Sequence, residues 1–133
     1  MRLIEQPADF RASNETFIFG AGEGGLIVYK ALSRVSNVKV VGFIDNNKRG
    51  ELRGLPIVGL DDVLKRGANA RIVIASTYAF EIAAQLQQSG ITDFDNALPL
   101  INAKNGHKTE QKRRLKALMT IILFFGFLFW LLV

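Results

Sequence analysis

Short apolar runs alternate with amphipathic stretches along the first hundred residues of the chain. The runs at 16–19, 38–44 and 71–75 are rich in β-branched and aromatic residues, which is typical of buried strands. Apolar positions at helical spacing predict helices over 23–34, over 61–66 and after residue 77. In the last of these, Phe80, Ile82, Ala83 and Leu86 are predicted to face inward and Gln85, Gln87 and Gln88 outward. Residues 93–97 predict a final edge strand.

This alternation predicts the α/β class. Near-continuous apolar strands are typical of a parallel sheet that is covered on both faces. We therefore expect a small Rossmann-like parallel sheet of about four strands flanked by helices. In the order of the chain, these strands are predicted to lie in the order 2-1-3-4 across the sheet. That order would place Ser76 and Thr77 beside the turn that follows the first strand.

The end of the sequence has a different pattern. Residues 117–133 carry no charged side chain, and Thr120 is their only polar one. A helix of this length spans about 25 Å, against roughly 30 Å of hydrocarbon in a bilayer. We therefore predict a nucleotide-binding domain over 1–98, a basic linker over 99–116 and a transmembrane helix over 117–133. A helix buried in an oligomer and a helix lying in the membrane interface remain as alternatives.

The net charge of +5 is concentrated in one segment. Residues 1–103 hold 11 basic and 11 acidic side chains, whereas residues 104–116 hold six basic side chains and one acidic. A nucleic-acid-binding protein would present basic groups on a folded face, so we expect no nucleic-acid partner. Basic residues next to an apolar segment favour contact with anionic lipid. The positive-inside rule then predicts a single-pass protein of the inner (cytoplasmic) membrane, with its N-terminal domain in the cytoplasm.

The first strand runs into the turn Gly20-Ala21-Gly22-Glu23-Gly24-Gly25, which has the spacing G-x-G-x-x-G. In a strand–turn–helix context, Gly20 permits the tight turn, Gly22 allows a pyrophosphate to approach the backbone, and Gly25 lets the helix pack on the sheet. Free N–H groups at the helix start would bind the phosphate. Asp45 ends the next strand, and its carboxylate could accept hydrogen bonds from a ribose. The same carboxylate would repel a 2′-phosphate, so NADP is disfavoured.

These features predict a ligand site made of Gly20, Ala21, Gly22, Glu23, Gly24, Gly25, Asp45, Asn46, Ser76 and Thr77. For Glu23, a plain role in the first helical turn is the simpler interpretation. The alternative for the whole set is that the glycines only form a tight turn and that Asp45 caps a loop.

The sequence predicts neither a catalytic residue nor a metal site. It has no cysteine and a single histidine, His107, in a polar stretch. The pairing Tyr-x-x-x-Lys of short-chain dehydrogenases is missing after both Tyr29 and Tyr78. Asp61 and Asp62 are better explained as a helix cap than as metal ligands.

The segments "IFGAGEGG" and "VVGFIDNNKRGELRGLPIVGLDDVL" resemble the Rossmann-like (CoA-binding-like) domain of CapD-type polysaccharide biosynthesis proteins, which are membrane-bound nucleotide-sugar epimerases and dehydratases. The matching positions are Gly20, Gly22, Gly25, Gly42, Phe43, Asp45, Gly50, Gly54, Pro56, Val58 and Gly59. The resemblance implies a nucleotide or nucleotide-sugar ligand, with a UDP-sugar or another nucleotide favoured and NAD possible. The catalytic domain of that family is absent, and the membrane segment follows the domain instead of preceding it.

The resemblance implies a membrane-anchored nucleotide or nucleotide-sugar binding module that serves as an accessory or regulatory subunit in bacterial surface-polysaccharide biosynthesis. Its partners would be the membrane and a membrane-associated polysaccharide enzyme, or a second copy of the chain. One alternative is an NAD-dependent nucleotide-sugar epimerase or dehydratase, or a truncated fragment of one. A second is a structural membrane protein with a vestigial site.

Overall fold

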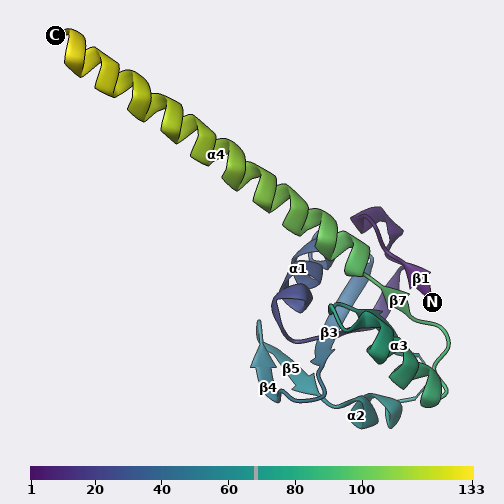
Figure 1. Ribbon diagram of the computed structural model, residues 1–133. Helices are drawn as coiled ribbons and strands as arrows, with labels where there is room; N and C mark the ends of the chain where they lie inside the picture. Colours follow the sequence, from purple (N-terminus) through teal and green to yellow (C-terminus); the bar gives the residue numbers. More distant parts are fainter. Residues whose placement is uncertain (68) are drawn as a thin grey trace. The chain divides into compact units, whose positions relative to one another are not determined.

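A computed structural model describes residues 1–67 and 69–133 and divides the chain into two compact units, Met1–Asn102 and Ala103–Val133. The strands are β1 (Arg2–Leu3), β2 (Ser13–Phe19), β3 (Val38–Ile44), β4 (Gly50–Leu52), β5 (Leu55–Val58), β6 (Arg71–Ile74) and β7 (Asp95–Asn96). The helices are the 3₁₀ turn η1 (Pro7–Asp9), α1 (Glu23–Leu32), α2 (Leu60–Leu64), α3 (Ala79–Gln88) and α4 (Leu98–Leu132). Figure 1 shows the arrangement of the elements of the first unit.

The strands of the first unit form one sheet in the order β1-β7-β6-β2-β3-β5-β4. All neighbouring pairs are parallel except β4 and β5. The four strands predicted from the sequence lie in the predicted relative order. This topology and the mixed α/β composition make the unit Rossmann-like.

The prediction of about four strands is wrong, because the sheet has seven. β1 and β4 have only two and three residues, too few for an alternating pattern to show in the sequence. β4 joins β5 through a two-residue turn at Arg53 and Gly54, both with positive φ, as a type I′ hairpin turn requires. Because β1 pairs with the far side of β7, the strand predicted at 93–97 is not at the edge.

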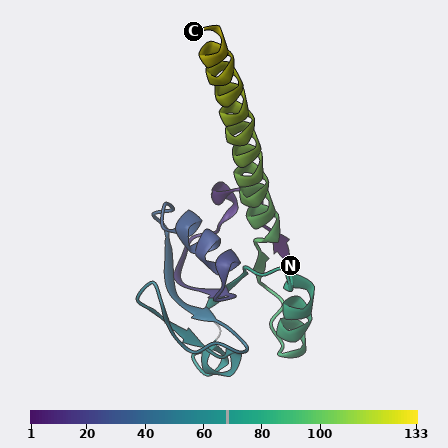
Figure 2. The same ribbon diagram turned by 60° about the vertical axis from the view of Figure 1, so that its left-hand side comes forward.

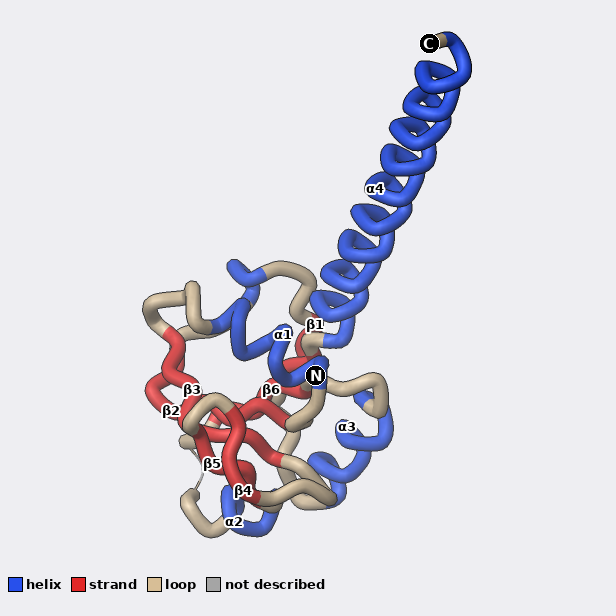
Figure 3. Tube along the Cα trace, turned by 90° about the vertical axis from the view of Figure 1, so that its left-hand side faces the viewer, coloured by secondary structure: helices blue, strands red, loops and turns tan. Residues whose placement is uncertain are grey.

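The alternation of side chains along the strands divides the core into two layers. Ile18, Phe43 and Val73 face one side, where they belong to the same buried cluster as residues of α1. Phe17, Phe19 and Ile74 face the other side, with residues of α2 and α3. Figure 3, in which strands are red, shows α1 and α2 on opposite sides of the sheet, and Figure 2 gives a second view. Both faces are therefore covered, as the apolar strands predict.

Helix α3 differs from its prediction at one position. Ile82, Ala83 and Leu86 are buried, but the side chain of Phe80 is 73% exposed. Ala79, which is fully buried, occupies the inward position instead. Ala79, Ile82, Ala83 and Leu86 have the spacing i, i+3, i+4, i+7 of one helical face, and Phe80 is one residue off that face.

Helix α4 runs without interruption from Leu98 to Leu132, so the segment predicted as a linker is helical. Pro99 lies in the first turn, where its missing N–H costs no hydrogen bond, and no proline follows it. Leu100 and Ile101 are buried in the first unit. An 18-residue window of α4 has a mean hydropathy of 2.3, and by length and composition this helix could span a membrane.

Truncating Leu86 should destabilise the first unit strongly, because its side chain is fully buried between α3 and the sheet. We expect Leu86→Ala to lower the free energy of unfolding by about 2–5 kcal/mol. Phe80→Ala on the same helix is the control, and we expect a change within about 0.5 kcal/mol. Urea titration of the full chain in detergent micelles measures both; equal losses would place Phe80 in the core and contradict the structure.

Candidate functional site

The carboxyl ends of β2, β3 and β6 lie side by side at one edge of the sheet. From β2 the chain continues through α1 to β3, its neighbour on one side. On the other side of β2 lies β6, which continues through α3. The helices leaving β2 and β6 cover opposite faces of the sheet. Such a switch point opens a crevice at the strand ends, which is where ligands of open α/β sheets bind.

Packing alone requires three of the glycines in the turn after β2. Gly20 has a φ of +126°, and a Cβ on Gly20 or on Gly24 would lie 2.6 Å from the carbonyl oxygen of Ala75. A Cβ on Gly25 would collide with the carbonyl oxygen of Gly20. The turn is therefore pressed against the end of β6, and no side chain fits between them.

Packing does not explain the fourth glycine, Gly22. A Cβ there would meet only the Nζ atom of Lys48, at 3.9 Å, and the backbone of Gly22 is extended with φ of −108°. Gly22 is the N-cap of α1, and no side chain of the described residues caps this helix. The N–H groups of the first turn point out of the helix start without intrahelical acceptors. Gly22 thus keeps the approach to these donors open.

Glu23 is the first residue of α1, and its side chain is exposed. A carboxylate there complements the positive end of the helix dipole, which agrees with the simpler interpretation of this residue. Its predicted contact with a ligand stays a prediction.

The carboxylate of Asp45 holds two loops together. Its Oδ2 accepts a hydrogen bond from the N–H of Ala21 at 3.1 Å, and its Oδ1 accepts from the N–H groups of Asn47 and Lys48 at 2.9 Å each. A carboxylate offers about four acceptor positions, so three are already in use. Asp45 therefore caps the β3–β4 loop and fixes it to the glycine turn, which leaves little capacity for a ribose.

These contacts also set the charge of Asp45. Burial of the carboxylate favours its neutral form, but the N–H groups of Lys48, Asn47 and Ala21 and the nearby Lys48 charge outweigh that effect. The pKa of Asp45 consequently lies below its ordinary value. The group is ionised throughout the physiological range.

Two cations follow Asp45 in the loop. The Nζ of Lys48 donates to the carbonyl oxygen of Ala21 at 3.3 Å, beside the start of α1. Arg49 donates to the carbonyl oxygens of Asp45 and Lys48 at 2.8 and 2.7 Å, which braces the loop itself. Sequence reasoning missed Lys48, whose only signal is its place three residues after the acid that ends a strand.

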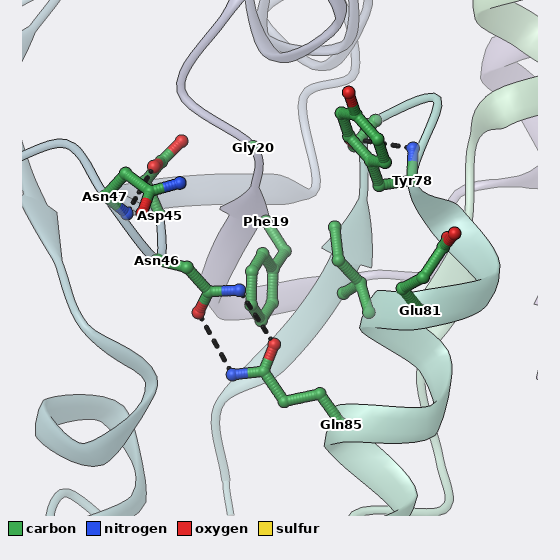
Figure 4. Close-up of a pocket in the computed structure, with 10 residues that line it drawn as sticks. Phe19, Gly20, Asp45, Asn46, Asn47, Tyr78, Glu81 and Gln85 are labelled. Carbon is green, nitrogen blue, oxygen red and sulfur yellow. Dashed lines mark hydrogen bonds between the residues drawn. The ribbon is translucent and has the colours of Figure 1, made fainter.

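A pocket of about 350 Å³ opens at the switch point. Its lining residues are Phe19, Gly20, Asp45, Asn46, Asn47, Ser76, Tyr78, Glu81, Ile82 and Gln85. Figure 4 shows Asp45 and Asn46 on one side of it and the residues of α3 on the other. Four predicted site residues line this pocket: Gly20, Asp45, Asn46 and Ser76. The remaining predicted residues, which do not line it, are Ala21, Gly22, Glu23, Gly24, Gly25 and Thr77.

Besides Phe19 and Asn47, the lining residues that sequence reasoning missed come from α3 and its N-cap, Tyr78. Tyr78, Glu81, Ile82 and Gln85 recur at i, i+3, i+4 and i+7, so they share one face that begins just after β6. Gln85 was predicted to point outward. Its side chain does lie outside the core that covers the sheet, but it lines the pocket. The hydroxyl of Ser76 accepts a hydrogen bond from the N–H of Tyr78 at 3.1 Å and so shapes the entry to this helix.

A second pocket of about 380 Å³ adjoins the first and shares Asp45, Asn46 and Gln85 with it. Asp61 and Asp62 also line it. The carboxylate of Asp62 accepts a hydrogen bond from the N–H of Gly59 at 3.2 Å, which is the helix cap that the sequence suggested. Within residues 1–67 and 69–133, no group of three or more metal-ligating side chains comes together.

Residues 12–94 match a family model described as C2185-like, N-terminal. The match covers more than half of the chain, and the chain therefore belongs to this family. A crystal structure of RSP, a Rex-family repressor, is similar at 17% sequence identity and a TM-score of 0.49, over 80% of this chain and 63% of that one. The chain thus spans less than two thirds of the repressor's length. No curated protein matches the sequence.

The predicted membership of the CapD-type family is wrong, because the match is to the C2185-like family instead. The quoted segments contain a glycine turn, an acid at the end of the next strand and a hairpin. In the structure these features fix the turn against Ala75 and the loop against Asp45. The glycine turn and the acid are therefore required by the packing of this kind of sheet, and they do not distinguish the families that share it.

The glycines of the turn should respond differently to the addition of one methyl group. We expect Gly24→Ala to destabilise the chain by about 1–3 kcal/mol, because the Cβ would lie 2.6 Å from a backbone oxygen that cannot move aside. Gly22→Ala is the control and should cost clearly less than Gly24→Ala, at most about 1 kcal/mol, because its Cβ meets no backbone atom and only the preference of the N-cap for glycine over alanine is lost. Urea unfolding measures both; a similar loss at Gly22 would contradict its open surroundings.

Replacing Asp45 should loosen the glycine turn in a pH-dependent manner. We expect Asp45→Asn to lower the free energy of unfolding at pH 7 by about 1–3 kcal/mol, because an amide cannot accept all three N–H groups. Since the folded pKa is lowered, this stabilisation is complete above the unfolded pKa of about 3.9 and is lost as the pH falls through the folded value. The difference between wild type and variant, measured by urea unfolding from pH 7 to pH 3, should shrink below about pH 4. A constant difference would show that the charge is not responsible.

Proposed function

We propose that this member of the C2185-like family is a nucleotide-binding protein held at a membrane by α4. The phosphate groups would bind at the start of α1, and the nucleoside would occupy the neighbouring pocket. The observation that carries the proposal is the open start of α1: an uncapped helix whose N-cap is a glycine that packing does not require, with a lysine ammonium beside it.

Electrostatics supports an anion at this position. The start of a helix carries a partial positive charge, and a cation placed there is unfavourable. The Nζ of Lys48 nevertheless lies near Gly22 and donates to the carbonyl of Ala21. Glu23 offsets part of this positive charge from the solvent side. A phosphate would accept from the free N–H groups and pair with Lys48.

The chemistry of the pocket suits a nucleoside better than a second phosphate. Its acidic groups, Asp45 and Glu81, would repel an anion. Its amide and hydroxyl groups, on Asn46, Ser76 and Gln85, can exchange hydrogen bonds with a sugar or a base. Phe19 and Ile82 supply an apolar surface for a ring. The ligand would therefore lie with its phosphates toward α1 and its nucleoside toward α3.

The proposal admits several nucleotides. A UDP-sugar, another nucleotide or NAD would all present a phosphate and a base. The bonds that Asp45 already makes argue against its predicted role in reading the ribose. A role in surface-polysaccharide assembly, beside a membrane-associated enzyme, stays a prediction, and the site contains no feature that favours it.

The membrane part of the proposal is supported by α4 alone. Apart from Thr120, its residues after Lys116 are apolar, all of them are exposed, and a bilayer would bury them. The basic residues between 104 and 116 would then lie at the anionic face, which would place the first unit in the cytoplasm.

Binding is tested by calorimetric titration of the full chain in lipid nanodiscs with ADP, UDP, UDP-glucose and NAD. We expect saturable binding of at least one of them at millimolar concentration or below. Gly22→Val should weaken that binding by more than about tenfold, because the side chain would block the free N–H groups. The control is Gly106→Val, at a glycine of α4 with nothing within 4 Å of its Cβ position. Absence of binding by wild type, or equal binding by both variants, would contradict the proposal.

A further inference from the structure

The side chains of Asn46 and Gln85 are paired with each other across the site. The Nδ2 of Asn46 donates to the Oε1 of Gln85 at 2.9 Å, and the Nε2 of Gln85 donates to the Oδ1 of Asn46 at 3.0 Å. Asn46 belongs to the loop after β3 and Gln85 to α3, 39 residues later. Figure 4 shows the two amides edge to edge, with the Phe19 ring beside them. Each amide thus presents one donor and one acceptor to the other.

This arrangement is the one that an amide side chain makes with the edge of a nucleobase. Asn and Gln bind adenine through a neighbouring donor and acceptor, and the pairing is planar and bidentate. A base and a second amide are therefore interchangeable partners in geometry. Either amide of the pair could exchange its present partner for a base and keep its own donor and acceptor paired, while the displaced amide turns to water.

The pair can be opened at little cost. Asn46 is exposed and Gln85 half-buried, and hydrogen bonds between neutral groups near the surface add little to stability because water competes for them. Within the described residues, neither amide has another side-chain partner. Opening the pair would therefore break no other side-chain hydrogen bond among the described residues.

The position of the pair gives a base room to enter. Asn46 and Gln85 line both the pocket of about 350 Å³ and the adjoining one of about 380 Å³, so they form a common wall. Ligand sites usually enclose about 300–1,000 Å³, and each pocket alone lies near the lower limit. Parting the amides would join the two spaces. The apolar surface of Phe19 and Ile82 lies in the first pocket, where it can pack against the face of the ring.

We propose that Asn46 and Gln85 recognise the nucleobase of the ligand, which replaces one amide of the pair as the partner of the other. This inference rests on the proposed nucleotide binding and adds the residues that determine its base specificity. The alternative is that the pair only ties the loop to α3.

The test separates the base from the rest of the ligand. The full chain in nanodiscs is titrated with ADP, with UDP and with ribose 5-phosphate, which has no base. Because the base pairs with one amide only, we expect one of the two variants Gln85→Leu and Asn46→Leu to weaken binding of the preferred nucleotide by about tenfold, the effect of losing a bidentate base contact, and to leave ribose 5-phosphate unchanged. The other variant, which lacks only the displaced amide, should bind the nucleotide at least as tightly as wild type.

Gln87→Leu is the matched control, at an exposed glutamine of the same helix, and should bind all three compounds as wild type does. If Gln85→Leu and Asn46→Leu bind the nucleotides as tightly as this control, or lose nucleotide and ribose 5-phosphate equally, base recognition by the pair is contradicted while nucleotide binding stands. If wild type binds none of the nucleotides, both proposals fail.

Discussion

The close approach of the glycine turn to the carbonyl oxygen of Ala75 is the constraint on which the site depends. Two glycines, Gly20 and Gly24, contact the end of β6 at distances that no side chain would permit. This contact sets where α1 begins relative to the switch point. Because α1 leaves on one face of the sheet and α3 on the other, the same contact also determines where the crevice opens.

Asp45 adds a second restraint at the same place. Its carboxylate ties the turn to the β3–β4 loop, and that loop places Lys48 at the start of α1 and Asn46 against Gln85. One half-buried acid thus positions both the cation that we propose for a phosphate and the amide that we propose for a base. We regard Asp45 as a residue that organises the site and not as one that reads the ribose.

The sequence predicted the parts of this molecule that rest on local periodicity. The α/β class, the strands β2, β3 and β6, and the helices α1, α2 and α3 follow from apolar spacing, and the relative order of the central strands was also correct. The two-residue strand β1 could not be predicted, because its only determinant is pairing with β7, more than ninety residues away. The helical continuity of α4 through 99–116 was missed because polar residues suggested a linker, although nothing after Pro99 breaks a helix.

For the site, the turn was visible in the sequence, but the contacts across it were not. Tyr78, Glu81 and Gln85 look like ordinary surface positions until α3 is placed beside the end of β3. The bonds of Asp45 likewise depend on a loop conformation that spacing does not reveal.

The most direct test of nucleotide binding at the turn is to observe its backbone amides. In NMR spectra of the full chain in nanodiscs, the amide resonances of Gly22, Glu23, Gly24 and Gly25 should shift saturably as ADP or UDP is added. We expect smaller shifts for Leu3 and Gly90, which lie outside the crevice. Unchanged amides at the turn, in the presence of nucleotide that binds elsewhere or not at all, would contradict the account.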